Sequence, residues 1–354
     1  MREYHFFVCS HGFGHIKRDL GLIREILKFD SDIKIYIYVN LNHYMDFSPY
    51  IIEWYPNLNQ DKIIFDTNYM NNSPDYLNTS GYSFQLYCEW INELKKIEFN
   101  KNSIIFSDNL IGLIAVNKQA ILIGSFLWTE IKSMTTKSDY KKIHEYEVSL
   151  LRKYKPKMLG INQIVMPGVL NKTNFISFPW LCDKFSNQKE ENIKDNKKTI
   201  LISGGSNKII KDVENIINLL SKHDLCIYVD NGIYNNLNQK KDVSIFDYKE
   251  SSYKCIRYII GRPGIGLLLD SIKYSIPILM IFETENEEMI HNSNIVSKLG
   301  FGININSFHI EKSANNELIS IITNNKLYKD FKKALNNQLI GGNKLMAKYI
   351  ISLN

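Results

Sequence analysis

Short apolar runs rich in β-branched residues recur along the first half of the chain, and segments with helical spacing separate them. The runs that we predict as strands are HFFVCS, IKIYIYV, KIIFD, SIIFSD and AILIGSF. After the first run, apolar residues occur at the spacing of one helix face, at Ile16, Leu20, Ile23 and Leu27. A second helical pattern occupies FQLYCEWINELKKIEF. Strands that alternate with helices predict βαβ units and a parallel sheet.

The same alternation starts again after DKFSNQKEENIKDNKK, a highly charged segment with the composition of a linker. The strands predicted after it are TILIS, LCIYVD, DVSIFD, YIIG and IPILMIF, and the helices are KIIKDVENIINLLSK, SSYKCI and LLLDSIKY. The pattern therefore predicts two α/β domains, at residues 1–182 and 199–335, with a linker at 183–198. We expect a C-terminal helix at 336–354 to pack back on the N-terminal domain. The order of the strands does not follow from the pattern.

Composition places the chain among ordinary globular proteins. Its 354 residues suffice for two domains with separate cores, and 44% are apolar and 23% charged. The net charge of +6 suits an anionic substrate but is too small to indicate a nucleic-acid partner. The mild positive charge, with aromatic residues near Tyr44 and Tyr69, leaves peripheral association with a membrane open.

Cysteines and apolar runs bear on the compartment. The 5 cysteines are scattered and form no CxxC pair, which favours a reducing compartment over a disulfide framework or a zinc site. The first residues lack the apolar length of a signal peptide. The longest apolar run, IPILMIF, is too short to span a bilayer. We therefore expect a cytoplasmic protein, with the inner face of the membrane as one place of action.

Two glycine-rich turns in the second half follow predicted strands, near the carboxyl ends where ligands of such domains usually bind. The first turn places Gly204, Gly205 and Ser206 before a helix, where free backbone N–H groups can bind an anion. Tight turn geometry alone explains two glycines there equally well. The second turn, in IIGRPGIG, precedes a helix with one acidic residue, Asp270.

The segment from IIGRPGIG to the later EMIHN resembles the donor-binding half of GT-B glycosyltransferases. It is most similar to the branch that contains the N-acetylglucosaminyltransferase forming lipid II. The resemblance implies an α/β fold of GT-B architecture, with two Rossmann-like domains facing each other across a cleft. It also implies that Asp270 binds the ribose hydroxyls of a nucleotide, since a carboxylate accepts hydrogen bonds from both. The other donor-binding positions that it implies are Arg262, Gly264 and Gly266 with Gly204, Gly205 and Ser206 around the diphosphate, and Phe246, Glu287, Glu288 and Asn292.

One departure from the family pattern concerns the donor sugar. The family often has an Asp or Glu followed by Gln that contacts sugar hydroxyls shortly before the position of Asn292. Here Glu288 stands in the acidic position and Met289 replaces the glutamine. A UDP-linked donor is expected, but the identity of its sugar stays open.

The first predicted strand leads into GFGHIKR, which fits a G-x-G-H-x-x-R pattern of the same branch. A related UDP-sugar hydrolase of pseudaminic acid synthesis has this pattern too. Two later segments, FSDNL and GSFLWTE, are similar to segments of related glycosyltransferase-like proteins. The resemblance covers roughly Phe6–Trp128 and Thr199–Gly302.

His15 is the candidate general base, because imidazole titrates near neutral pH. We expect it in the first turn of a helix, with Gly12 and Gly14 letting substrate approach the backbone. Asp19, one helical turn on, is a candidate to orient the ring. His11 has a structural or a substrate-shaping role. Packing of His15 against the sheet is the alternative to catalysis.

Arg18 and Asp108 have open roles at this stage. Arg18 points off the apolar face of the predicted helix, so it contacts phosphate or substrate, or is solvated or salt-bridged. Asp108 ends a predicted strand and is an acceptor contact, an alternative base or a capping residue of the loop.

Other cofactor chemistries lack their sequence signals. The DSD string at Asp30 precedes a predicted strand, at the wrong end for a ligand, so we expect a solvated loop rather than a metal site. The glycine turns match neither the dinucleotide-binding nor the P-loop pattern. We predict no cofactor and no metal requirement.

The resemblance thus implies an inverting glycosyltransferase of hexosyl or N-acetylhexosaminyl type, which moves a sugar from a nucleotide-sugar donor to a carbohydrate or lipid-linked acceptor. Because related enzymes act in cell-surface glycan synthesis, the resemblance implies that setting too. A nucleotide-sugar hydrolase that uses the same histidine to activate water is the alternative. A nucleotide-sugar binder without catalysis is a third class, against which the G-x-G-H turn argues.

Overall fold

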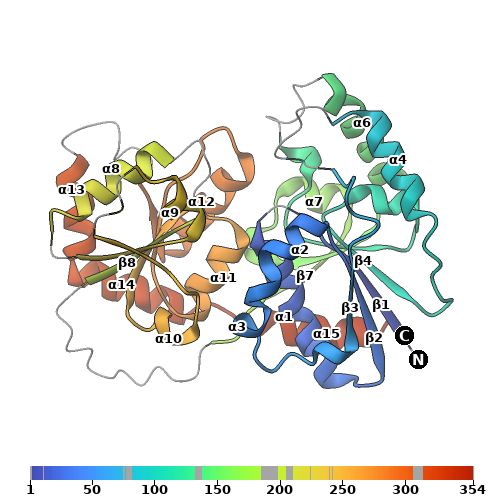
Figure 1. Ribbon diagram of the computed structural model, residues 1–354, viewed down its shortest axis with the longest axis horizontal. Coiled ribbons are helices and arrows are strands. Elements are labelled where there is room, and N and C mark those ends of the chain that lie inside the picture. Colours follow the sequence, from blue (N-terminus) through green and yellow to red (C-terminus); the bar gives the residue numbers. More distant parts are fainter. Residues whose placement is uncertain are drawn as a thin grey trace. The chain divides into compact units, whose positions relative to one another are not determined.

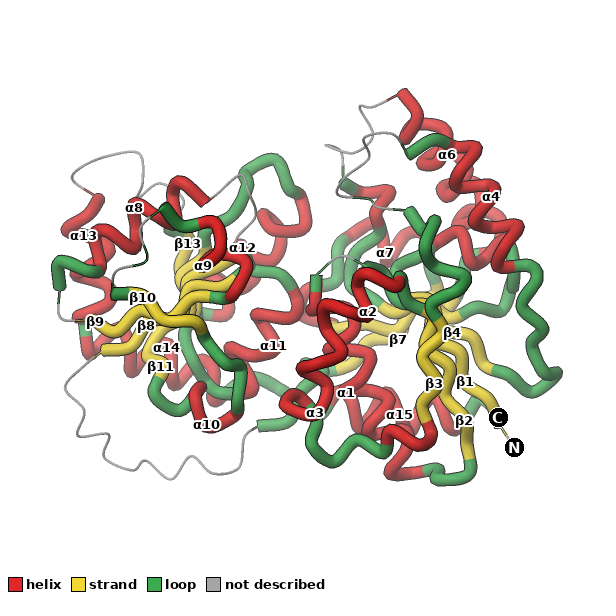
Figure 2. The backbone as a smooth tube through the Cα atoms, viewed as in Figure 1, coloured by secondary structure: helices red, strands yellow, loops and turns green. Residues whose placement is uncertain are grey.

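The computed structural model describes residues 2–10, 12–74, 76, 82–131, 138–184, 198–204, 210–223, 225–238, 240, 242–305 and 314–353. The chain divides into two compact units. Unit 1 comprises Met1–Leu181 with Gly341–Asn354, and unit 2 comprises Cys182–Ile340. Each unit is built on its own sheet with helices around it (Figures 1 and 2).

The described strands of unit 1 form one 7-stranded sheet in the order β3-β2-β1-β4-β5-β6-β7. Every neighbouring pair runs parallel. The strands are β1 (Arg2–Phe7), β2 (Ile33–Tyr38), β3 (Ile63–Asp66), β4 (Ile104–Asp108), β5 (Ile121–Ile123), β6 (Lys157–Ile161) and β7 (Asn174–Phe178). Central strands carry runs of isoleucine that are buried on both faces, as a covered parallel sheet requires.

Helices connect and cover the strands of unit 1. They are α1 (Phe13–Phe29), α2 (Leu41–Phe47), α3 (Ile51–Trp54), α4 (Phe84–Leu94), α6 (Ser138–Tyr154), α7 (Pro167–Lys172) and α15 (Gly342–Ile351). Short 3₁₀ turns are η1 (Ser48–Tyr50), η2 (Gln60–Lys62), η3 (Ile111–Ala115), η4 (Trp128–Glu130) and η5 (Asn162–Ile164). The C-terminal α15 packs against α1 (Figure 1). Gly21 permits this approach, because a Cβ there would lie 3.0 Å from Nδ2 of Asn343.

The described strands of unit 2 form a 6-stranded parallel sheet in the order β10-β9-β8-β11-β12-β13. The strands are β8 (Lys198–Ser203), β9 (Leu225–Val229), β10 (Val243–Ile245), β11 (Ile256–Gly261), β12 (Ile278–Met280) and β13 (Gly302–Asn304). The helices are α8 (Ile210–Leu220), α9 (Asn231–Asn236), α10 (Glu250–Tyr253), α11 (Ile265–Lys273), α12 (Glu287–Leu299), α13 (Ala314–Thr323) and α14 (Asn325–Asn336).

Both sheets reverse their strand order next to the first strand, as Rossmann-type sheets do. In unit 1 the reversal lies between β1 and β4, and in unit 2 it lies between β8 and β11. Ligands of such sheets bind beyond the carboxyl ends of the strands at this point. The segments after β1, β4, β8 and β11 are therefore where a site is expected.

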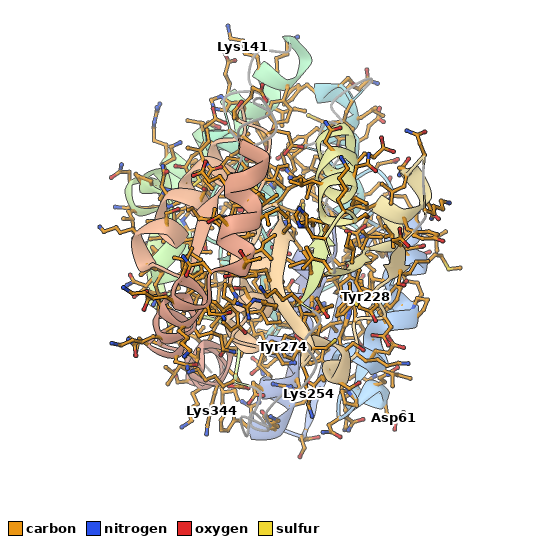
Figure 3. All side chains as sticks on the ribbon, turned by 90° about the vertical axis from the view of Figure 1, so that its left-hand side faces the viewer. Asp61, Lys141, Tyr228, Lys254, Tyr274 and Lys344 are labelled. Carbon is orange, nitrogen blue, oxygen red and sulfur yellow. The ribbon has the colours of Figure 1, made fainter. Side chains whose placement is uncertain are left out.

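The cores contain the large aromatic side chains. Trp90, Trp128 and Trp180 are all buried in unit 1. Lysines lie outside: Lys141, Lys254 and Lys344 extend from the surface (Figure 3). Among the described residues, no helix is both long and apolar enough to cross a membrane.

Two sequence predictions of element boundaries need correction. The predicted helix in SSYKCI is shorter, since α10 ends at Tyr253 and Ile256 already belongs to β11. The C-terminal segment that joins unit 1 begins at Gly341 instead of residue 336, because α14 continues to Asn336 within unit 2.

Candidate functional site

The helix after β1 begins with the G-x-G-H turn. Gly12 caps α1 with φ +68°, a left-handed conformation that glycine adopts without the steric penalty of a side chain. Apart from its two chain neighbours, no atom of the described residues lies within 4 Å of the position that a Cβ of Gly12 would take. Gly14 and His15 follow as the second and third residues of α1, which confirms the predicted placement of His15 in the first helical turn.

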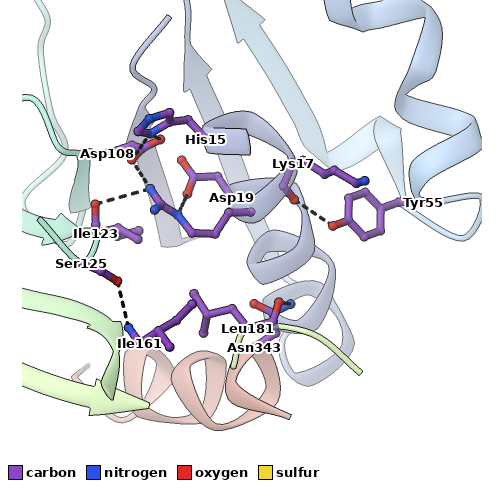
Figure 4. Close-up of polar contacts among 11 residues, drawn as sticks. His15, Lys17, Asp19, Tyr55, Asp108, Ile123, Ser125, Ile161, Leu181 and Asn343 are labelled. Atoms are coloured by element: carbon purple, nitrogen blue, oxygen red, sulfur yellow. Dashed lines mark hydrogen bonds and ion pairs between the residues drawn. The ribbon is translucent and has the colours of Figure 1, made fainter. Parts of the chain in front are cut away.

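The ring of His15 contacts Asp108 at the end of β4 (Figure 4). Its Nδ1 lies 2.9 Å from both carboxylate oxygens, and both side chains are buried. A carboxylate can only accept, so Nδ1 carries the hydrogen and Nε2 is the nitrogen that can take a proton. The pair joins β1 and β4, the strands at the reversal point of the sheet.

Arg18 also contacts Asp108. Although the sequence placed it off the apolar face of the helix, it is 3% exposed, and its Nη2 donates to Oδ1 of Asp108. Burial opposes the charge of Arg18, but Asp108 and Asp19 raise its pKa above the ordinary value. The same contacts act on Asp108: burial alone would raise its pKa, and Arg18 with His15 outweighs burial and lowers it. Asp108 is therefore the ionised partner of His15, and a free, solvated Arg18 is excluded.

Asp19 does not orient the ring of His15, contrary to the expectation from helical spacing. Its carboxylate faces the guanidinium of Arg18, with Oδ1 3.6 Å from Nε (Figure 4). Burial raises the pKa of Asp19 well above its ordinary value, and the charge of Asp108 raises it further against the opposing effect of Arg18. The pKa values of the two carboxylates are therefore shifted in opposite directions, that of Asp19 upward and that of Asp108 downward.

Two polar side chains beside this cluster were not predicted. His43 lies on α2, where Asn40 caps the helix by accepting from the backbone N–H of His43 at 3.4 Å. Burial and the neighbouring charge of His15 lower the pKa of His43 to about 4, so it is neutral at physiological pH. Asn109 follows Asp108 directly and has φ +60°. Both residues come shortly after a predicted strand. The expectation that site residues lie beyond the carboxyl ends of strands is the one sequence signal that would have identified them.

In unit 2, the turn after β11 is held from behind by α12. Nδ2 of Asn292 donates to the carbonyl of Pro263 at 2.8 Å, and Asn292 is buried, so it supports the turn. Nε of Arg262 lies 2.9 Å from Oε2 of Glu283. Gly204, after β8, comes next to Arg262, whose backbone N would lie 3.9 Å from a Cβ at Gly204.

The first helical turns after β11 and β12 carry the other predicted donor-binding residues. Gly264 caps α11 and Gly266 is its second residue, the arrangement of Gly12 and Gly14 in α1. Glu287 and Glu288 occupy the first turn of α12, where the helix dipole favours negative charge.

Asp270 on α11 is held by an aromatic group. The hydroxyl of Tyr253 donates to its Oδ2 at 2.9 Å, and Tyr253 stacks on Tyr274 with ring centroids 4.0 Å apart. Tyr274 is labelled in Figure 3. Phe246 is buried with its ring edge-on to Tyr253 at 4.9 Å. Phe246 therefore packs behind the residue that holds Asp270, and no sequence signal indicated Tyr253.

The first glycine turn of unit 2 is only partly described. The backbone N–H of Gly204 donates to Oδ2 of Asp230 at 2.7 Å, so it is already paired. Gly205 and Ser206 lie outside the described residues, as does His11 in unit 1. The structure brings Gly204 to the Arg262 turn.

Asp30 and the clustering of metal-ligating side chains bear on whether the protein holds a metal ion. Asp30 of the DSD string ends α1 before β2, and its Oδ2 lies 2.5 Å from Nη2 of Arg2. Across the described ranges, no three His, Cys, Asp or Glu side chains gather as a metal site would require.

Comparisons with known proteins identify the fold. The sequence matches no protein-family model, and no curated protein matches it. The glycotransferase of kitacinnamycin has a similar structure, with TM-score 0.67, 11% identity and coverage of 99% of this chain and 98% of that chain. Medicago truncatula UGT71G1, solved with UDP-glucose, gives TM-score 0.66 and 12% identity over 99% of this chain and 98% of that chain. Glycosyltransferase VinC, solved with dTDP, gives TM-score 0.57 and 10% identity over 100% and 99%.

These likenesses concern the fold, given the low identities. The chain has the α/β fold of GT-B glycosyltransferases, with a Rossmann-type parallel sheet in each unit. The predicted fold class is confirmed.

Proposed function

We propose that this protein is a glycosyltransferase that moves a sugar from a nucleotide-sugar donor to a hydroxyl acceptor, with His15 as the general base. The observation that carries the proposal is the buried contact between Nδ1 of His15 and Asp108 at the reversal point of the unit 1 sheet. The GT-B fold supports it, since structural neighbours are glycosyltransferases solved with UDP-glucose or dTDP.

Asp108 prepares His15 for this task in two ways. Its carboxylate fixes the tautomer by accepting from Nδ1, which leaves the lone pair on Nε2. Its negative charge stabilises the imidazolium that forms when Nε2 takes a proton, as the carboxylate of a catalytic triad does. Arg18 and His15 lower the pKa of Asp108, which makes its carboxylate a weaker base, so we assign Asp108 the orienting role.

The reaction that we propose is one displacement. Nε2 of His15 takes the proton of the acceptor hydroxyl while the acceptor oxygen bonds to the anomeric carbon of the donor. The bond from that carbon to the diphosphate oxygen breaks, and its electron pair leaves with the nucleoside diphosphate. Attack comes from the face opposite the leaving group, so the configuration inverts.

We assign donor binding to unit 2. Asp270 would accept hydrogen bonds from the ribose hydroxyls, held in place by Tyr253. Arg262 and the backbone N–H groups at the start of α11 would stabilise the leaving diphosphate without a metal ion. We propose a UDP-linked hexose or N-acetylhexosamine, with Glu287 and Glu288 near its hydroxyls. Asn292 contributes by holding the turn.

For the acceptor we propose a carbohydrate or lipid-linked hydroxyl compound. We further propose that the protein acts in the cytoplasm, beside the membrane when the acceptor is lipid-linked. Hydrolysis of the donor, with water in place of the acceptor, uses the same base and is an outcome of the test below.

The test measures release of nucleotide from UDP-, GDP-, CMP- and dTDP-sugars in the presence of EDTA, with and without a panel of hydroxyl acceptors. We expect acceptor-dependent release from a UDP-sugar. Nucleotide release that does not depend on the acceptor would show that the protein is a hydrolase. Release that EDTA abolishes would overturn the metal-free mechanism. Binding of no nucleotide at all would overturn the proposed function.

A further inference from the structure

Two buried polar side chains come after strands at the same edge of the sheet as His15 and Asp108. His43 is 7% exposed and Asn109 is 1% exposed. Within the described residues, Nε2 of His43 and both side-chain atoms of Asn109, Oδ1 and Nδ2, make no hydrogen bond. Buried polar groups in proteins are nearly always paired, so these three atoms require an explanation.

The backbone of Asn109 adds a second irregularity. Its φ of +60° is uncommon for a residue other than glycine, and asparagine is one of the few that tolerates it. Strained residues of this kind persist where the surrounding structure holds them, and they cluster at functional sites. The strain holds the amide of Asn109 against Gly124, where a Cβ would lie 3.4 Å from its Cγ.

The order of the sheet places these side chains in one row. His43 follows β2, His15 follows β1, and Asn109 follows β4, and these three strands are neighbours in the sheet. The charges of His15 and Asp108 both act on His43, which places it within electrostatic reach of the pair. The ring of His43 also lies 6.1 Å from that of Phe13, two residues before His15. His43 and Asn109 therefore follow the two strands that neighbour β1 in the sheet, and His15 follows β1 itself.

The chemistry of these atoms indicates what they bind. Nδ2 of Asn109 is a donor and Oδ1 is an acceptor, while Nε2 of a neutral imidazole is one or the other according to its tautomer. A hydroxyl group both donates and accepts, so hydroxyls match all three atoms. A carboxylate or phosphate would leave Oδ1 without a donor, and an apolar compound would leave every atom unpaired.

We propose that His43 and Asn109 bind hydroxyls next to the one that His15 deprotonates, so the acceptor is a polyhydroxylated compound with vicinal hydroxyls. This inference rests on the proposed function and narrows its acceptor. A sugar ring has such vicinal hydroxyls, whether the sugar is free or lipid-linked. A site that has buried groups for several hydroxyls discriminates strongly against an analogue that lacks them, because those groups then stay unpaired.

The test compares acceptors that differ by one hydroxyl: trans-1,2-cyclohexanediol against cyclohexanol, with the donor that the wild type turns over. We expect wild type to prefer the diol. We expect His43→Phe and Asn109→Gly each to lower kcat/KM for the diol about tenfold to a hundredfold, the loss of one or two buried hydrogen bonds. Transfer to cyclohexanol and binding of UDP should stay within about twofold of wild type.

The chosen substitutions keep the fold. Phenylalanine retains the ring that packs against Phe13, and glycine accepts the backbone conformation of Asn109. The controls are His223→Phe and Asn57→Gly, which change exposed residues. Equal loss with both acceptors, or equal use of both by wild type, would overturn the inference while leaving glycosyl transfer intact.

A second measurement does not depend on turnover. Excess methyl hexopyranoside should raise the Tm of wild type and not that of either variant, and octyl hexopyranoside tests whether a lipid tail adds to binding. A rise that requires His43 and Asn109, in a protein that transfers no sugar, would uphold the inference and overturn the proposed function. The same shift, or no shift, in all three proteins would overturn the inference.

Discussion

Nδ1 of His15 lies 2.9 Å from the carboxylate of Asp108, a residue 93 positions later in the chain. The contact joins the helix after β1 to the end of β4, and it is buried. Arg18, one helical turn after His15, contacts the same carboxylate. Asp108 therefore orients the imidazole of His15, and Arg18 contributes to the lowered pKa of Asp108.

Asp108→Asn tests the orienting role. Asparagine keeps the size of the side chain but removes the charge that would stabilise the imidazolium. We expect kcat to fall about a hundredfold to ten-thousandfold, the usual contribution of an organised general base, with the affinity for UDP unchanged. Asp61→Asn, at an exposed position labelled in Figure 3, is the matched control. A folded variant with kcat within tenfold of wild type would contradict the role.

Arg18→Met tests the ion pair. It leaves Asp108 buried without its cation, and breaking a buried pair in this way costs about 3–5 kcal/mol. The 4 tryptophans of the chain all lie in unit 1, so their fluorescence in a urea titration reports the free energy of unfolding of that unit. Arg2→Met, whose side chain is 40% exposed in its contact with Asp30, should lose less than about 1 kcal/mol. Equal losses of unfolding free energy in both variants would show that the buried ion pair stabilises unit 1 no more than the exposed one.

Glu147 predicts a pH dependence of stability. It is buried on α6, and the hydroxyls of Tyr76 and Tyr87 donate to its Oε1 at 2.6 and 2.7 Å. Burial raises its pKa to about 7 against the opposing effect of the two tyrosines. The folded state thus binds a proton that the unfolded state releases near pH 4.5, so stability falls as pH rises from about 4.5 through 7, by about 1.4 kcal/mol per unit at most.

Glu147→Gln should remove this dependence, since glutamine resembles the protonated acid. Tryptophan fluorescence in urea at several pH values between 4.5 and 8 measures it, because Trp128 stacks on Tyr76 with ring centroids 4.8 Å apart. Glu145→Gln changes an exposed glutamate of the same helix and should retain the wild-type profile. Identical profiles for the two variants would refute the assignment to Glu147.

Tyr253→Phe tests how unit 2 holds Asp270. Without the hydroxyl, Oδ2 of Asp270 loses the hydrogen bond that it accepts from Tyr253. We expect Kd for UDP, measured by calorimetry, to rise about tenfold, and about a hundredfold in Asp270→Asn, which removes the charge. Tyr234→Phe, on α9 of the same unit, should bind like wild type. Unchanged affinity in Asp270→Asn would remove Asp270 from the nucleotide site.

The sequence predicted what is local in the chain. Glycines before His15 indicated the start of α1, and the run IIFSD placed Asp108 at a strand end. Strands that are wholly apolar, such as β5 and β12, were predicted, whereas β6, β7 and β13 were not. Those three contain glycine or polar residues, which weaken the β signal.

The contacts between distant residues could not be predicted, and this explains the errors. Helical spacing suggested Asp19 as the partner of His15, because such spacing identifies only neighbours on the same helix. The real partner, Asp108, comes from another strand and depends on the strand order. The burial of Arg18 has the same cause, since the carboxylate it contacts is not on its own helix.

His15→Ala tests the central claim most directly, through two measurements on one protein: the rate of nucleotide release with donor and acceptor, and Kd for UDP. We predict that the rate falls about a hundredfold to ten-thousandfold while Kd stays within about twofold. The control His223→Ala, at an exposed position, should match wild type in both measurements. A variant that keeps its rate within tenfold, or that loses binding as much as turnover, would contradict the assignment of His15 as the base.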